Sequence, residues 1–298
     1  MRRQIVAVSA LSTVLVSAVW AQAPAGADLW RVAGTALAVP NPLVSGATGF
    51  LWNPAAPAPE YAVGLEVIQT GSVVGLSGLS AGAQTKVGKR TQLGLVFGRM
   101  QVRDLVRTTT SPNSSVGSIP VHEQFIGGKV GIRAAWFEVA TLLRFHDERF
   151  DALGENGFTL DFGVYAEPWS IARFAAATHF FPLDFSTQNT TDFFFAGEVE
   201  PLRSNMLRDS QWRVLGRYGL TVRPAFGPDH MLSVGARYLD LLSIDFAVTH
   251  ESGFASGGWR PGVSFALRIG RYTLGAARGS GVNDVSGTFR ITVDAQLQ

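Results

Sequence analysis

The chain has 298 residues, with 25 basic and 23 acidic side chains, a formal net charge of +2 and no cysteine. The missing cysteines exclude disulfides and thiolate metal sites, and the balanced charge, without a basic cluster, excludes a nucleic-acid partner. Only 16% of the residues are charged, against about 25% in an average soluble domain. Mean hydropathy is positive without a long apolar run after the first residues, which favours strands with one apolar face.

Residues 1–23 match a secretory signal peptide. A basic start at residues 2–3, a mostly apolar stretch at 5–20 and the small-residue sequence Ala21-Gln22-Ala23 follow the usual three-part order. Because Pro24 disfavours cleavage directly after Ala23, the cut could instead fall after Ala21 or Ala25, and its position stays open. The sequence therefore predicts an exported protein.

A proline-rich block, GFLWNPAAPAP (49–59), precedes the first strand. Pro54, Pro57 and Pro59 lack N–H donors and cannot sit in the middle of a sheet, and Asn53 can bond its own turn. The block is either an exposed linker or a segment packed inside the fold. Three large apolar residues at 50–52 would gain little in water, so the sequence favours packing.

From residue 60 to the end, apolar and polar residues alternate with a period of two, as in FTLDFGVYAE (158–167). Most runs reach the 9–11 residues or so that a tilted strand needs to cross a bilayer. The expected strands lie near 60–69, 72–86, 91–106, 121–134, 136–146, 158–167, 170–181, 192–200, 211–224, 230–240, 243–250, 259–269, 271–278 and 285–297. The prediction is an all-β fold, a transmembrane antiparallel β-barrel of about 14 strands (12–14), residues 60–298, in the outer membrane of a bacterium.

The connections between these strands differ in length, as they do in outer-membrane barrels. Short turns are expected at 86–90, 167–170, 226–230 and 270–271, and long loops at 108–120, 146–157, 184–192, 200–210 and 251–258. Aromatic residues near strand ends suggest interfacial girdles in contact with outer-membrane lipid: Tyr61, Trp136, Trp169, Phe181, Trp212, Tyr238, Trp259, Tyr272 and Phe289. A soluble β-sandwich shares the alternation, but strand length, the signal peptide and the low charge favour the barrel.

The polar face of the strands is expected to line a lumen. Its predicted lining residues are Glu138, Arg144, Asp161, Arg173, Arg213, Arg217, Arg268 and Arg290, which form a network of paired charges. His146, His179 and Asp161 could meet by chance, but no nucleophile, base and acid occur in a recognisable motif. The other histidines, His122, His230 and His250, lack metal-ligand spacing, and no phosphate-binding loop occurs. The sequence predicts no enzyme, no cofactor and no metal site.

One strand, TQLGLVFGRMQV (91–102), breaks the alternation between Phe97 and Met100. An extra residue beside a glycine is typical of a β-bulge. Gly98 and Arg99 are therefore a candidate kink in the barrel wall, with an imprecise strand end as the alternative.

Residues 33–59 resemble the N-terminal segment of the FadL-type outer-membrane transporters and their PorV and PorQ relatives. The matching positions are Gly34, Ala36, Ala38, Phe50, Trp52, Asn53, Pro54 and Ala55. The chain departs from the family at Pro40-Asn41-Pro42, where an acidic pair is usual, and at Ala56, where glycine is common. The resemblance implies that residues 24–59 form a periplasmic hatch segment that folds back into the barrel. It also implies that Phe50, Trp52, Asn53, Pro54 and Ala55 gate the passage of a ligand.

The resemblance further implies passive transport, with a hydrophobic or amphipathic small molecule as cargo. Two other functions stay open from the sequence. A PorV-like barrel would act as a scaffold or shuttle for a secreted or surface protein, and a general diffusion porin would have an unplugged lumen.

Overall fold

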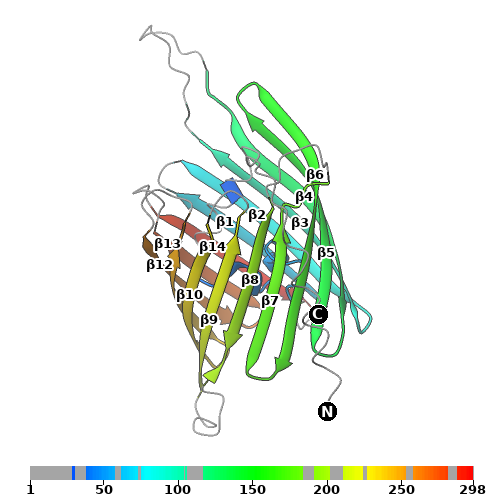
Figure 1. The fold of residues 1–298 in the computed structure, drawn as a ribbon, viewed down its shortest axis with the longest axis vertical. Coiled ribbons are helices and arrows are strands. Elements are labelled where there is room, and N and C mark those ends of the chain that lie inside the picture. Colours follow the sequence, from blue (N-terminus) through cyan, green and yellow to red (C-terminus); the bar gives the residue numbers. More distant parts are fainter. Residues whose placement is uncertain are drawn as a thin grey trace.

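The computed structural model describes residues 29–30, 38–57, 62–72, 75–103, 105, 117–183, 191–201, 211–223, 227–252, 258–280 and 287–297. The signal peptide, Gly34, Ala36, Pro59 and Tyr61 lie outside these residues. The strands are β1 (Val63–Ser72), β2 (Leu76–Val87), β3 (Thr91–Val102), β4 (Val121–Arg133), β5 (Phe137–Phe150), β6 (Leu153–Trp169), β7 (Ala172–His179), β8 (Asp192–Val199), β9 (Trp212–Val222), β10 (Asp229–Tyr238), β11 (Leu242–His250), β12 (Trp259–Ile269), β13 (Tyr272–Gly279) and β14 (Thr288–Leu297). Each strand pairs antiparallel with its sequence neighbours, and β1 pairs with β14 to close a barrel (Figure 1). The predicted fold class is confirmed.

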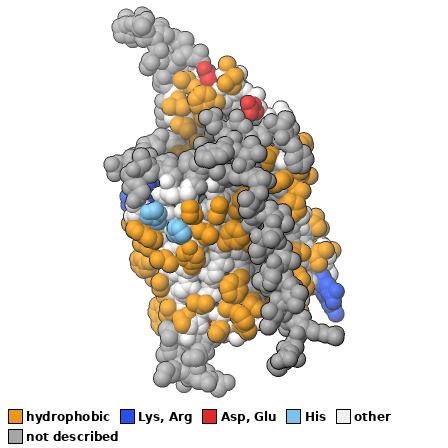
Figure 2. All heavy atoms as spheres, in the orientation of Figure 1, with side chains coloured by type: hydrophobic (Ala, Val, Ile, Leu, Met, Phe, Trp, Pro, Cys, Tyr) orange, Lys and Arg blue, Asp and Glu red, His pale blue; other side chains and the backbone are white. Residues whose placement is uncertain are grey.

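The alternation of the sequence becomes an inner and an outer wall. On β3, Leu95 is 66% exposed on the outside, whereas Gln92 and Val96 are almost fully buried inside. Apolar side chains cover much of the described surface in Figure 2, with the few charged groups toward its ends. An apolar belt around a closed barrel requires lipid as its surroundings. None of the described helices is long and apolar enough to cross a membrane.

The connections define two ends of the barrel. The first residue of β1 and the last of β14 lie at one end, together with the turns 88–90, 134–136, 170–171, 239–241 and 270–271. Short turns face the periplasm in such barrels, so we call this the periplasmic end and the opposite one the outer end. Two connections do not follow the rule that short turns lie at the periplasmic end and long loops at the outer end. β8 ends and β9 begins at the periplasmic end, although the connection 200–211 is long, and β9 ends and β10 begins at the outer end, although the connection 223–228 is short.

The predicted loop 146–157 is wrong. β5 runs to Phe150 and β6 begins at Leu153, so the two strands form a tall hairpin that rises above its neighbours at the top of Figure 1. A polar stretch such as 146–157 predicts a loop from sequence alone, but a strand that extends beyond the lipid can present polar side chains on both faces.

Exposed aromatic residues gather at the periplasmic end. Trp136, Trp169, Trp212 and Tyr272 are each about half exposed on the outer wall beside the short turns. At the outer end, Trp259 is the first residue of β12 and Phe289 the second residue of β14. These positions suit the two membrane interfaces, where amphipathic rings are favoured.

The predicted kink at Gly98 and Arg99 is wrong. The pairing of β3 with β2 and with β4 continues without a shift from Thr91 to Val102. The alternation breaks because Met100 points inward and packs in the interior. A register shift does occur in β6, between Ala166 and Trp169, where Pro168 supplies no N–H for the ladder.

Candidate functional site: the filled lumen and its outer cavity

The segment 38–57, here called the inner segment, lies inside the barrel. It contains two short 3-10 turns, Asn41–Leu43 and Gly49–Leu51. Among the predicted hatch residues Phe50, Asn53 and Ala55 are fully buried, Trp52 is 4% exposed and Pro54 is buried. Apolar residues of the segment pack in one cluster with inward residues of β2, β3, β4, β5, β7 and β8. The lumen beside these strands is therefore packed as a protein core.

Asn53 fixes the middle of the inner segment. Its Oδ1 accepts from the Ala55 N–H at 2.9 Å, and its Nδ2 donates to the carbonyls of Pro42 at 3.0 Å and Val164 at 3.3 Å. One amide thus closes its own turn, joins two parts of the segment and reaches β6, which satisfies most of its hydrogen-bonding capacity. A Cβ on Gly163 would lie 2.1 Å from Asn53 Oδ1, so glycine allows this close approach.

Charged side chains of the wall bind the backbone of the inner segment. Arg144 Nη2 donates to the Leu51 carbonyl at 2.6 Å and pairs with Asp161 at 2.5 Å, all within the buried interior. Lys129 Nζ donates to the Ala56 carbonyl at 2.9 Å. Two buried cations therefore take protein carbonyls in place of water, which offsets part of the cost of burying them.

Carboxylate and hydroxyl groups complete the attachment on other strands. Glu66 of β1 accepts from both the N–H and the hydroxyl of Thr48 at 2.7 Å. Ser233 of β10 donates to the Ala38 carbonyl at 2.7 Å. The recorded polar contacts of the inner segment thus reach β1, β2, β4, β5, β6 and β10.

The other predicted lining residues also lie on inward positions of the wall. Arg217 pairs with Glu198 and Asp245 at 2.6 Å each, and Glu198 also pairs with Arg173 at 2.5 Å. This chain of charges joins β7, β8, β9 and β11. The remaining pairs are Glu138 with Lys129 at 3.8 Å, Arg213 with Glu200 at 2.7 Å and Arg290 with Glu66 at 3.7 Å. Arg268 is half-buried and donates to the Gly270 carbonyl at 3.4 Å.

The three residues that could have met by chance have separate roles. Asp161 pairs with Arg144 and accepts from the Phe181 N–H at 3.3 Å. His179 stacks on Trp52 with ring centroids 5.1 Å apart, and His146 Nε2 lies 2.8 Å from the Thr159 hydroxyl. These contacts belong to packing and charge pairing.

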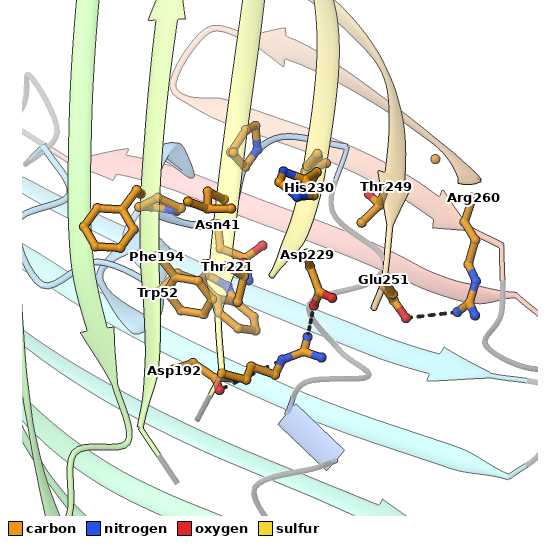
Figure 3. A pocket seen from close by; sticks show the side chains of 18 of the residues that line it. Asn41, Trp52, Asp192, Phe194, Thr221, Asp229, His230, Thr249, Glu251 and Arg260 are labelled. Carbon is orange, nitrogen blue, oxygen red and sulfur yellow. Dashed lines mark hydrogen bonds and ion pairs between the residues drawn. The ribbon is translucent and has the colours of Figure 1, made fainter. Parts of the chain in front are cut away.

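A cavity opens between the inner segment and the wall at the outer end (Figure 3). Its apolar part is formed by Trp52 and Pro42 of the inner segment, Phe194 of β8 and Met231 of β10. Its polar part carries two ion pairs. Arg223 contacts Asp229 at 2.8 Å and Arg260 contacts Glu251 at 3.1 Å.

Glu251 follows β11 directly and lies above the membrane-spanning strands. Burial raises the pKa of the Glu251 carboxyl above its ordinary value, and the Arg260 guanidinium partly offsets this. The sequence analysis did not single out Asp229, Glu251 or Arg260. The alternation along each strand could have shown that Asp229 and Arg260 point inward, but not that they line the same cavity.

The inner wall of β12, β13 and β14 differs from the rest. Most of its inward residues are half-exposed and small: Gly262, Ser264, Ala266, Thr273, Gly275, Ala277 and Thr292, whereas Thr288, Arg290 and Asp294 of β14 are buried. We call this part of the wall the open side. Gly262 and Ser280 belong to the lining of the cavity, so the cavity lies next to the outer end of the open side.

No family model matches the chain, and no curated protein matches it. Several solved structures share its fold. A Pseudomonas aeruginosa FadL homologue is similar with a TM-score of 0.52, at 9% identity over 90% of this chain and 98% of that one. The Pseudomonas putida toluene transporter TodX is similar with a TM-score of 0.50, at 8% identity over 93% and 98% of the two chains. The protein is an outer-membrane β-barrel.

A third structure, the Acinetobacter baumannii outer membrane protein Omp33, has a TM-score of 0.49, at 8% identity over 80% of this chain and 98% of that one. The predicted localisation to the bacterial outer membrane is confirmed by the fold and its apolar belt. The relationship to PorV and PorQ stays a prediction.

Proposed function

We propose that this barrel passes small amphipathic compounds across the outer membrane, with the cavity as the outer binding site and the inner segment as a hatch. The observation that carries the proposal is the two-sided lining of the cavity, with aromatic and apolar groups on one side and ion pairs on the other. A few polar groups on a mostly apolar surface are typical of small-molecule sites.

The cavity couples ligand binding to the hatch. Trp52 belongs to the inner segment and contacts both His179 and Phe194 of the wall, with centroids 5.1 and 6.4 Å apart. A ligand whose apolar part enters beside Trp52 competes with these contacts. The polar group of the ligand would remain near Arg223 or Arg260. Occupancy of the cavity would therefore weaken the contacts between the hatch and the wall.

The open side offers the path from the cavity toward the periplasm. Its inward residues on β12 and β13 are mostly small and half-exposed, whereas those of β2, β3 and β4 are mostly buried against the inner segment. Between Arg260 and Arg268 of β12, a ligand on this path passes hydroxyl and methyl groups of β12 and β13, which suits an amphipathic compound better than a strongly charged one. In this proposal passage requires a shift of the hatch and not its expulsion.

Two measurements test the proposal. Native mass spectrometry of protein extracted gently from outer membranes should find a bound small amphipathic molecule, and Trp52→Ala should lose it. Trp212→Ala is the matched control, because Trp212 lies on the outer wall. Recovery of a secreted protein without a small ligand would favour the scaffold function and contradict the proposal.

The second measurement is the conductance of the purified protein in planar bilayers. Wild-type protein should conduct ions weakly, and a variant lacking residues 38–57 should conduct like an open pore, because this segment packs with inward residues of six strands and fills the lumen beside them. Equal conductance of the two proteins would overturn the hatch. A large conductance of the wild type would instead identify a general diffusion porin.

A further inference from the structure

Three potential metal ligands meet at the outer end of β4 and β5, away from the cavity. Glu123 of β4 is paired in register with Glu148 of β5, and His146 lies two residues before Glu148 on the same strand. All three therefore point to the inside of the barrel. One ligand atom from each, two carboxylate oxygens and an imidazole nitrogen, lie within 4.8 Å of one another.

His146 is oriented for binding through Nδ1. Its Nε2 is 2.8 Å from the Thr159 hydroxyl, whereas Nδ1 has no hydrogen-bond partner and lies 3.5 Å from Glu123 Oε1. The residue is only 5% exposed. A buried polar nitrogen without a partner is costly and calls for an explanation. With its proton on Nε2, the ring presents the Nδ1 lone pair toward the carboxylates, and a polar partner on the opposite ring nitrogen is usual for metal-binding histidines.

The position is reachable from the outside solution. Neighbouring outward residues at this level are polar, with Gln124 and Asp147 bonded to each other at 2.7 Å and Arg99 exposed. The site thus lies above the apolar belt. Glu148 is half-exposed, whereas Glu123 is 1% exposed, so an ion would arrive past Glu148 and stop at Glu123.

The surroundings favour a cation. Two carboxylates face one neutral imidazole, and the guanidinium of Arg144, two residues before His146, is itself paired with Asp161. Phe125 and Phe180 pack against the imidazole, with ring centroids 5.6 and 5.1 Å from it. These rings shield the site from water on the inner side and strengthen the attraction between the carboxylates and a cation.

We infer that Glu123, His146 and Glu148 bind a divalent transition-metal ion and so clamp β4 to β5 at the base of the tall hairpin. Bonds of about 2.0–2.2 Å from nitrogen and oxygen ligands to Zn²⁺ require the three atoms to approach each other by about 1 Å. One imidazole with two carboxylates suits Zn²⁺, Mn²⁺ or Fe²⁺, whereas Ca²⁺ needs six to eight oxygens. The inference is independent of the proposed transport function.

Titration of the detergent-solubilised protein with Zn²⁺, followed by calorimetry, tests the site. Binding should be saturable with one ion per chain, and Co²⁺ in place of Zn²⁺ should give a visible absorption spectrum typical of nitrogen and oxygen ligands. Glu148→Gln should weaken binding about tenfold or more, because loss even of an outer partner of a metal ligand costs about 10–100-fold in affinity. Thr159→Val should have an effect in that range, since it removes the hydroxyl that accepts from Nε2–H and keeps the ring in this tautomer.

The control is His122→Ala. His122 lies on the outward face of β4, 3.8 Å from Asp147, and its loss should leave Zn²⁺ affinity unchanged. Absence of saturable binding to the wild type would overturn the inference, as would binding that survives Glu148→Gln and is lost in His122→Ala. Because Glu148 is half-exposed, this variant should fold even where His146→Ala does not.

Discussion

The wall formed by β2 to β6 and the wall formed by β12 to β14 share the same alternation but have different interiors. Inward residues of the first are buried against the inner segment, and even charged ones such as Lys129 and Arg144 are shielded from solvent. Most inward residues of the second are small and half-exposed, with Ser264 and Gly275 as examples, although Arg290 and Asp294 of β14 are buried. The alternation along a strand determines which side chains point inward. Whether these side chains form a core or remain accessible to solvent depends on whether the inner segment packs against them.

The two walls also differ in which groups their arginines and lysines contact. On the wall formed by β2 to β6, here called the contact side, the cations Lys129 and Arg144 donate to backbone carbonyls of the inner segment. Such pairs are costly to break, since removal of one partner leaves a buried charge without compensation. On the open side Arg268 remains half-exposed near the periplasmic turns, where water solvates it. The comparison predicts that equal substitutions on the two walls have unequal effects.

The largest expected difference comes from arginine removal. Arg144→Met should lower the free energy of unfolding by about 3–5 kcal/mol, because Asp161 is left buried without its cation. Arg268→Met should lower it by less than about 1 kcal/mol, as for an exposed ion pair. Guanidinium unfolding of the detergent-solubilised barrel, followed by tryptophan fluorescence, measures both. Equal losses would mean that the two walls do not differ in this respect.

A smaller difference is expected from two inward glycines. Gly163→Ala places a Cβ 2.1 Å from Asn53 Oδ1, whereas Gly275→Ala meets no atom closer than 3.4 Å. The first should cost about 1–3 kcal/mol, as overpacking of a core does, and should raise ion conductance by displacing the inner segment. The second should leave conductance unchanged. If Gly163→Ala conducts like the wild type, Asn53 does not hold the segment in place.

The sequence predicted the parts of this architecture that depend on local pattern. Period-two alternation predicted the barrel and its strand number, and the proline block predicted that residues 49–55 stay out of the sheet. The contact of the inner segment with particular strands was beyond the pattern. Asn53 and Val164 are 111 residues apart, and Ala38 and Ser233 are 195 apart. Only the closed barrel brings them together.

The error at Gly98 has a physical cause that applies more widely. The pattern was interpreted on the assumption that inward residues are polar, as in a water-filled lumen. Inside a filled lumen, inward residues such as Val96, Met100 and Phe125 pack as a core, so an apolar residue on the inner face resembles a shift of register. Gly98 itself is explained by close packing, because a Cβ there would lie 2.5 Å from Trp30 and 2.6 Å from Phe125. The candidate metal ligands could not be found from the sequence because they lie on two strands. The pairing register of β4 and β5, and not a spacing along the chain, brings them together.

The smallest expected effect on stability, and the most direct test of the open side, comes from two consecutive alanines of β13. Ala277 points inward and is half-exposed, whereas Ala276 points outward on the lipid face. Ala277→Trp fills space in the lumen without touching a recorded contact of the inner segment, so it should reduce flux of a small amphipathic solute into proteoliposomes while unfolding stays near that of the wild type. Ala276→Trp adds the same ring to the outer wall, where lipid accommodates it, and flux should not change. If Ala277→Trp leaves flux intact, solutes do not pass along β12 to β14. The passage would then have to lie on the contact side, and the inner segment would have to leave its contacts with Arg144 and Lys129 for each transport event.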